Sequence, residues 1–126
     1  MSSAFTPAEI DYLNDPTKRL ARIATANPEA LPHVTPIGMW RHDPRTDSIE
    51  VTGRRFANTK KFRNVLTNPQ AAITIDDIAT TDPWRPRAII IQGTAEAIAD
   101  PDQPGEGHIR IHPDHVVSWG LDGPKS

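Results

Sequence analysis

Cysteine is absent from the 126-residue chain, and this absence excludes several kinds of chemistry. Without a thiol the protein has no disulfide bond, no thiolate nucleophile and no cysteine-ligated zinc or iron–sulfur centre. Long apolar runs are missing too, since no stretch approaches the roughly 18 apolar residues of a membrane helix. The amino terminus has neither the basic start nor the apolar run of a signal peptide. We therefore expect a cytoplasmic protein with no membrane partner.

An excess of positive charge is also lacking. The formal net charge is −2, which provides no general attraction to nucleic acid or to anionic membranes. Aromatic residues are few, and apart from Phe56 they do not alternate with basic residues as they do in nucleic-acid stacking surfaces. No Ser–His–Asp order, glycine-rich nucleotide loop or pair of carboxylates stands out. We expect no nucleic-acid partner and no hydrolytic activity.

Proline, in contrast, is abundant. The 13 prolines are about twice the number expected at an average frequency of roughly 5%. Apolar residues make up 37% of the chain, as in globular proteins, and a chain of this length can bury one core. The sequence therefore predicts a single domain over residues 1–126, rich in turns and in β structure.

The pattern along the chain predicts two helices and six strands. Thr6, Pro7 and Glu9 form the cap, first position and capping box of a short helix that ends near Asn14. A second helix is expected at 59–68, with Thr59 or Asn58 as its cap. Strands are expected at 19–26, 32–41, 48–53, 71–76, 87–98 and around 109–111, with a loop at 77–86. Short strands joined by frequent turns indicate a mainly β antiparallel barrel.

A cluster of basic residues precedes the second helix and indicates an anion site. From 51 to 75 the chain contains no Asp or Glu, whereas five Lys and Arg residues fall within 54–63. A helix start offers free amides and the positive end of the helix dipole. Thr59, Lys60 and Lys61 could each bond a phosphate there, and the two lysines should contribute most. The alternative is a solvated helix face that carries ordinary basic residues.

Two further segments fit a cofactor pocket. Pro36 and Gly38 interrupt a strand, and a strand glycine often marks close approach of a ligand. A planar ring could lie against Gly38 and Met39, although a bend at a barrel corner would also explain the glycine. Trp84 and Arg87 precede the apolar fifth strand and could supply an aromatic lid and a cation. Packing of the tryptophan on the core explains that segment equally well.

The histidines do not form a convincing metal site. His108 and His112 would be neighbours on a helix, but His112 precedes a proline and the alternation around them indicates a strand. On a strand they would lie about 13 Å apart, too far to share an ion. His33 and His42 are expected at solvent-facing positions. We therefore predict no metal ligands.

Taken together, these segments resemble the pyridoxamine 5′-phosphate oxidase-like split β-barrel family. The chain is most similar to its small branch that depends on the deazaflavin coenzyme F420. The resemblance covers about 20–121, nearly the whole chain. It rests on PHVTPIGMW at 32–40, RRFANTKKFRNV at 54–65 with Asn68-Pro69 beyond, PWRPR at 83–87 leading into GTAE at 93–96, and RIHPDHVVSWG at 110–120.

The resemblance implies a six-stranded split barrel that forms a homodimer, with the cofactor in grooves at the subunit interface. In the family pattern a hydroxyl residue and basic residues hold the phosphate, the end of a strand lies beside them, and the second strand borders the ring. Carried onto this chain, the cofactor-binding candidates are Gly38, Met39, Thr52, Gly53, Thr59, Lys60, Lys61, Asn64, Trp84 and Arg87.

One departure from the family bears on the cofactor. Flavin oxidases of the family carry a glutamine that reaches the flavin just after the arginine that matches Arg87, whereas this chain has Ala88. The resemblance therefore favours F420 over FMN. It implies hydride transfer between the deazaflavin and a small electron-poor organic substrate, with no catalytic acid or base assigned. The alternatives are an FMN-binding oxidase or flavin reductase, and a non-catalytic carrier of a cofactor or haem.

Overall fold

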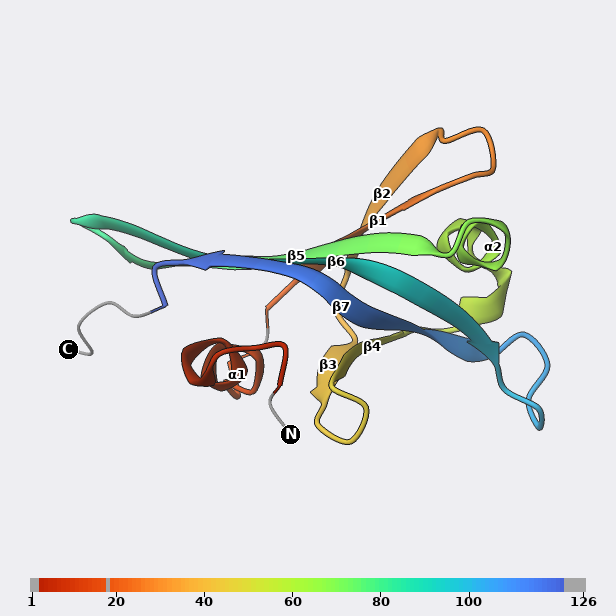
Figure 1. Cartoon of the computed structure of the whole chain (residues 1–126), viewed down its shortest axis with the longest axis horizontal. Coiled ribbons are helices and arrows are strands. Elements are labelled where there is room, and N and C mark those ends of the chain that lie inside the picture. Colours follow the sequence, from red (N-terminus) through yellow and green to blue (C-terminus); the bar gives the residue numbers. More distant parts are fainter. Residues whose placement is uncertain (1–2, 18, 122–126) are drawn as a thin grey trace.

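The computed structural model describes residues 3–17 and 19–121 and consists of one curled antiparallel sheet with two helices (Figure 1). Helix α1 spans Pro7–Leu13, and helix α2 spans Lys60–Thr67 after a short 3₁₀ turn at Phe56–Asn58. None of the helices in the described ranges is both long and apolar enough to cross a membrane. The strands are β1 Ala21–Ala26, β2 Pro32–Ile37, β3 Trp40–Asp43, β4 Ser48–Thr52, β5 Gln70–Thr81, β6 Trp84–Ala99 and β7 Gly107–Trp119.

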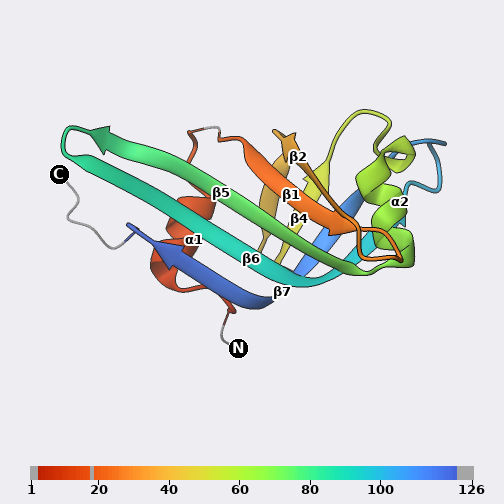
Figure 2. The same cartoon turned by 90° about the horizontal axis from the view of Figure 1, so that it is seen from above.

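The sheet curls because its two edge strands are consecutive in the chain. Its strand order is β2-β1-β5-β6-β7-β4-β3, so the connection at Gly38 and Met39 joins the two edges. Figure 2 shows the sheet wrapped around its concave side, with α2 near one end. Alternate residues of the strands fill that side with fully buried isoleucines, in agreement with the expected antiparallel barrel. The buried isoleucines are Ile23, Ile49, Ile73, Ile75, Ile89, Ile91, Ile109 and Ile111.

Both helices begin as the sequence predicts. The Thr6 hydroxyl accepts from the Glu9 amide at 3.2 Å, and the Glu9 carboxylate accepts from the Thr6 amide at 2.9 Å. Thr59 caps α2 by accepting from the Phe62 amide at 3.3 Å. Phe62 and Val65 then bury the apolar face of α2 against the sheet. The helix start that carries the predicted anion site is therefore fixed by local sequence.

The structure differs from the prediction in the number of strands. The described residues form seven strands, because the strand expected at 32–41 divides into β2 and β3. Residues 32–37 pair with β1, whereas residues 40–43 pair with β4 at the opposite edge of the sheet. The chain has to cross between the two edges at Gly38 and Met39. Gly38 therefore lies at a barrel corner, where the chain passes from one edge of the sheet to the other.

The expectation of a loop at 77–86 is also wrong, because most of this segment belongs to two strands. Strands β5 and β6 extend through it and leave only a tight turn between Thr81 and Trp84. Pro86 lacks an amide hydrogen, and it pairs with Ile78 beside a shift in register where a proline is tolerated. The last strand likewise runs on through Pro113, which pairs with Gly93 beside a second shift in register, where Asp114 is the extra residue of β7. Proline thus marks bulges here rather than strand ends.

Candidate functional site

The start of α2 combines a capping hydroxyl with exposed amides. The Thr59 hydroxyl donates to the Phe56 carbonyl at 2.7 Å and accepts from the Phe62 amide, so its single proton serves the fold. The amides of Lys60 and Lys61 have no acceptor within the helix, because a first turn has no preceding carbonyls. In this arrangement Thr59 shapes the anion site, and the two lysine residues supply its amides and charge.

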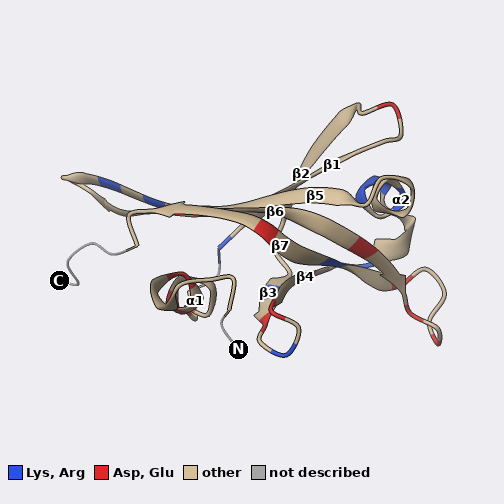
Figure 3. Cartoon of the chain, in the orientation of Figure 1, with Lys and Arg blue, Asp and Glu red and all other residues tan. Residues whose placement is uncertain are grey.

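Lys61 is the more enclosed of the two lysines. Its Nζ lies 5.0 Å from the centre of the Phe56 ring, and burial lowers the pKa of its ammonium group. Lys60 is exposed. Within the described ranges, no carboxylate forms an ion pair with either lysine. A half-buried cation without a protein carboxylate is suited to an external anion. Figure 3 shows basic residues along α2.

Sequence reasoning missed one carboxylate near this site. The Glu106 carboxylate accepts from the backbone amide of Arg55 at 3.1 Å, in the loop before α2. The two residues are far apart in sequence, and only the packing of the 100–106 loop brings them together. Glu106, Thr52 and Gly53 help to line a hollow of about 500 Å³ beside the basic loop. The predicted strand end at Thr52 and Gly53 thus faces a groove.

Asn64 lies apart from this groove. It is 6% exposed, and its amide nitrogen donates to the Thr25 hydroxyl at 3.1 Å. This bond joins α2 to β1 on the side of the helix that faces the sheet. The structure therefore gives Asn64 a role in attaching the helix, although the sequence placed it among the cofactor-binding candidates.

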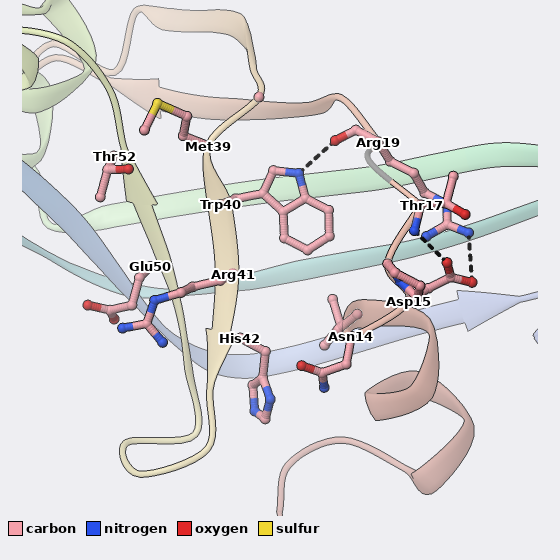
Figure 4. Close-up of a pocket in the computed structure, with 13 residues that line it drawn as sticks. Asn14, Asp15, Thr17, Arg19, Met39, Trp40, Arg41, His42, Glu50 and Thr52 are labelled. Carbon is pink, nitrogen blue, oxygen red and sulfur yellow. Dashed lines mark hydrogen bonds and ion pairs between the residues drawn. The ribbon is translucent and has the colours of Figure 1, made fainter.

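Gly38 and Met39 border a separate cavity of about 370 Å³. Figure 4 shows this cavity between β3 and the segment that connects α1 to β1. Its lining continues from Met39 to Thr52, whose amide donates to the Met39 carbonyl at 2.9 Å. The two predicted groups at 38–39 and 52–53 are therefore adjacent in space. His42, which was expected to face solvent, is buried in the cavity wall and bonded to Asp47 at 3.0 Å.

Arg87 is held by an ionic cluster between α1 and the β5–β6 hairpin. Its Nε donates to Asp77 at 2.9 Å, and the Nε of Arg19 donates to the same carboxylate at 2.9 Å. The Tyr12 hydroxyl donates to Asp77 at 2.9 Å. Burial alone would raise the pKa of Asp77, but hydrogen bonds from Arg87 and Arg19 outweigh it and lower the pKa to about 2. Trp84 is 64% exposed near the end of the hairpin.

A single chain does not bring this hairpin to the start of α2. The Phe62 ring of α2 lies beside Gly107. Gly107 pairs with Ala99, at the end of β6 that is far from the hairpin turn. Arg87 lies 12 positions before Ala99 (99 − 87), or about 40 Å along an extended strand. Figure 2 shows α2 and the hairpin at opposite ends of the sheet. Within one chain, Trp84 and Arg87 therefore lie far from Lys60 and Lys61.

A buried carboxylate on β4 was also missed by sequence reasoning. Glu50 is 5% exposed and accepts from Arg110 at 2.9 Å and from Ser48 at 2.8 Å. His108 lies 3.2 Å from its other oxygen. The alternation of β4 and β7, which puts Ile49 and Ile109 in the core, could have placed Glu50 and these partners together on the other face. In the part of the chain that the structure describes, no group of three or more His, Asp or Glu residues is arranged to hold a metal.

Comparisons with known proteins agree with this architecture. The 5a,11a-dehydrotetracycline/5a,11a-dehydrooxytetracycline reductase of Streptomyces rimosus is 37% identical over 127 residues, which cover 97% of this chain and 87% of the reductase. A conserved hypothetical protein of Mycobacterium tuberculosis has a similar structure, with a TM-score of 0.71, 20% identity, and coverage of 95% of this chain and 88% of that one. A heme binding protein of Mycobacterium smegmatis gives a TM-score of 0.67, 15% identity, and coverage of 98% and 57%.

The two structural likenesses show the split-barrel fold. Their sequence identities are too low to support a conclusion about function. The family match is broader in sequence. Residues 9–119 match the family described as pyridoxamine 5′-phosphate oxidase, and this range includes most of α1, all of α2 and every strand of the sheet. The chain therefore belongs to the pyridoxamine 5′-phosphate oxidase family.

Proposed function

We propose that this chain is an oxidoreductase that uses the deazaflavin coenzyme F420 to transfer a hydride to or from a small electron-poor organic molecule. The similarity to a reductase at 37% identity over almost the whole chain carries the proposal. Membership of the pyridoxamine 5′-phosphate oxidase family supports a flavin or deazaflavin as the cofactor. The cofactor supplies the redox chemistry, and the protein binds and orients the reactants.

The described residues fit the phosphate of such a cofactor. Lys61 is a half-buried cation that forms no ion pair with a carboxylate of the described residues, and the Lys60 and Lys61 amides open the helix. The groove lined by Thr52 and Gly53 lies beside the basic loop, and Thr52 also lines the cavity beside β3. Lys60 and Lys61 would hold the anionic end, and Gly38 and Met39 would border the ring.

The residue after Arg87 favours a deazaflavin over FMN. Ala88 is 3% exposed and ends in a methyl group, so its side chain makes no hydrogen bond to a ring. The family resemblance leads one to expect a glutamine there in a flavin oxidase. Reduced F420, when bound, supplies a hydride, so a carbon–carbon double bond would gain that hydride at one carbon and a proton at the other. The described residues single out no acid or base for this proton.

We further propose that the working unit is a homodimer. Trp84 and Arg87 of one copy would then complete the pocket that contains Lys60 and Lys61 of the other. The outer face of the sheet offers apolar contacts for a second copy, because Val117 is 42% exposed and Trp119 is 48% exposed. The cytoplasmic location expected from the sequence stays a prediction.

The experiment that tests this function is anaerobic mixing of the protein with reduced F420 and an enone or quinone acceptor. We expect saturable recovery of the oxidised F420 spectrum, in proportion to the protein added. Lys61→Ala should need more F420 to reach the same rate. Turnover with reduced FMN in place of F420 would support the flavin reductase alternative. Tight cofactor binding without turnover on any acceptor would support a carrier and would contradict the proposed reaction.

A further inference from the structure

The cavity of about 370 Å³ beside β3 lies within the size range of small-molecule sites. Its walls come from the segment that connects α1 to β1, from the connection between β2 and β3, and from strands β3 and β4. It touches Gly38, Met39 and Thr52, which are predicted to border the cofactor, but it does not contain Lys60 or Lys61. The cavity is therefore next to the predicted cofactor groove and separate from its phosphate end.

One wall of the cavity is a fixed aromatic surface. The indole nitrogen of Trp40 donates to the Arg19 carbonyl at 2.8 Å, which fixes the ring plane. Figure 4 shows the indole in the middle of the lining, with Met39 above it and His42 below. Met39 is 58% exposed, and a thioether adapts its shape to flat ligands. This wall is suited to a planar ring system.

A second wall is the open edge of β3. The Thr52 amide donates to the Met39 carbonyl, and bonded pairs alternate along an antiparallel ladder. The backbone groups of Trp40 and His42 therefore point away from β4, toward the outer edge of the sheet. A ligand along this edge meets carbonyls that accept and amides that donate, so a row of keto and hydroxyl groups would match it.

Two residues of the cavity wall also carry unpartnered polar atoms. Arg19 and His42 have side chains that are 4% and 3% exposed. Arg19 Nη1 and His42 Nδ1 are two of the three buried side-chain nitrogens that lack a hydrogen-bond partner among the described residues. Because the Asp47 carboxylate accepts from His42 Nε2, Nδ1 is the ring nitrogen left without a partner among the described residues. Buried polar groups normally have partners, so these two side chains carry hydrogen-bonding capacity that the described residues do not use.

From these observations we infer that the cavity between β3 and residues 13–17 and 19 binds the organic substrate, a planar ring system with keto and phenolic or enolic oxygens along one edge. The inference deepens the proposed function, on which it rests, by naming the substrate class. Arg41 lines the cavity on the side of Glu50 (Figure 4), where its exposed guanidinium can bond an enolate or phenolate oxygen.

The test uses 1,8-dihydroxyanthraquinone as the probe and tryptophan quenching as the readout, without cofactor. We expect saturable quenching that Trp40→Phe largely abolishes and Trp84→Phe preserves. The skeleton without hydroxyl groups, 9,10-anthraquinone, should bind several-fold more weakly. Quenching that depends on Trp84 or Trp119 instead of Trp40 would place the probe elsewhere and overturn the inference.

A matched pair of variants tests the contribution of charge. Arg41 and Arg45 both lie 3.5 Å from the Asp43 carboxylate, but only Arg41 is among the residues that line the cavity. Arg41→Gln should raise the Kd of the probe roughly tenfold, as expected for the loss of one charge-assisted bond. Arg45→Gln should leave the Kd unchanged. Equal effects of the two substitutions would contradict a local contact.

Titration of F420 into the probe complex separates this inference from the proposed function. Binding of both molecules together supports the inference, whereas displacement of the probe by F420 would assign the cavity to the cofactor and overturn it. If the probe binds and F420 does not, the cavity assignment stands and the F420 proposal fails. If F420 binds and the probe does not bind even then, the cavity assignment fails and the F420 proposal stands.

Discussion

Lys61 is the residue whose surroundings best match a ligand for phosphate. Its ammonium group is half-buried over Phe56, so part of its hydration is lost, and no carboxylate in the part of the chain that the structure describes compensates for this loss. A phosphate would restore that lost interaction. Glu106, bonded to the Arg55 amide nearby, adds negative charge that opposes an incoming anion.

These surroundings predict opposite effects for two substitutions. Lys61→Ala should weaken cofactor binding by about tenfold to a hundredfold, because a charge-assisted bond contributes 1.5–3 kcal/mol. Glu106→Gln should strengthen binding by a few-fold. Fluorescence titration measures both, and the melting temperature of the ligand-free Lys61→Ala protein should change little. A large loss of stability in Lys61→Ala would instead assign this lysine to the fold.

Thr59 supports the site through the helix. Its hydroxyl bonds both Phe56 and Phe62, and loss of a threonine cap costs about 1 kcal/mol. Thr59→Ala should therefore lower the free energy of unfolding by about this amount in urea denaturation, and Thr59→Ser should restore most of it. Unchanged stability in Thr59→Ala would show that the hydroxyl is not needed as a cap.

Local sequence predicted the parts of the site that depend on neighbouring residues. The cap at Thr59, the helix that follows and the strand end at Gly53 could be predicted because short-range patterns encode them. Glu106 and the bond from Asn64 to Thr25 could not, since these contacts join segments far apart in sequence. Sequence alone also gave no sign that His42 is buried, because its burial depends on the cavity wall around β3.

At the scale of elements, Asp77 ties α1 and Arg19, which precedes β1, to the β5–β6 hairpin. It receives hydrogen bonds from Tyr12, Arg19 and Arg87, and Arg19 is almost fully buried. The carboxylate thus fixes the segment that forms one wall of the cavity. Such a cluster is sensitive to the loss of one partner, because the remaining charges stay buried.

The cluster predicts a pH dependence of stability. The folded-state pKa of Asp77 is lowered from 3.8 to about 2, so its contribution is present above about pH 4 and is lost as the pH falls through about 2. At neutral pH the contribution is on the order of 2 kcal/mol. Melting temperatures between about pH 5 and pH 2 should show this loss, and Asp77→Asn should show less of it. Asp76→Asn is the control, since Asp76 is half-exposed and pairs only with Arg22 among the described residues. Equal profiles for wild type and Asp77→Asn would contradict the cluster.

Strand boundaries were harder to predict than helix starts. The strand at 32–41 divides because its two halves pair with partners at opposite edges of the sheet, which no local pattern records. The loop at 77–86 became a hairpin because shifts in register accommodate prolines that normally indicate strand ends. The order of the strands along the sheet likewise depends on long-range pairing.

At the scale of the whole molecule, the predicted cofactor residues fall at two ends of one sheet. Lys61 lies at the end with α2, and Trp84 lies at the end of the β5–β6 hairpin (Figure 2). In the proposed homodimer, each pocket would take its lysine from one copy and its tryptophan from the other.

This arrangement predicts complementation between two defective variants. In a heterodimer of Lys61→Ala and Trp84→Ala protomers, one pocket would carry both substitutions and the other neither. We expect each variant homodimer to bind the cofactor weakly and the purified heterodimer to regain one tight site per dimer. Counting sites by fluorescence titration checks this. A heterodimer without a tight site would place both residues in the same copy's pocket.

The account depends most directly on a cofactor phosphate at the start of α2. Its most direct test is a paired titration of oxidised F420 into the wild-type protein and into Lys61→Ala, with fluorescence as the measure of binding. We predict saturation at micromolar F420 for the wild type, and a Kd that is about tenfold to a hundredfold higher for the variant. Absence of micromolar binding to the wild type, or equal affinities for the two proteins, would contradict the account.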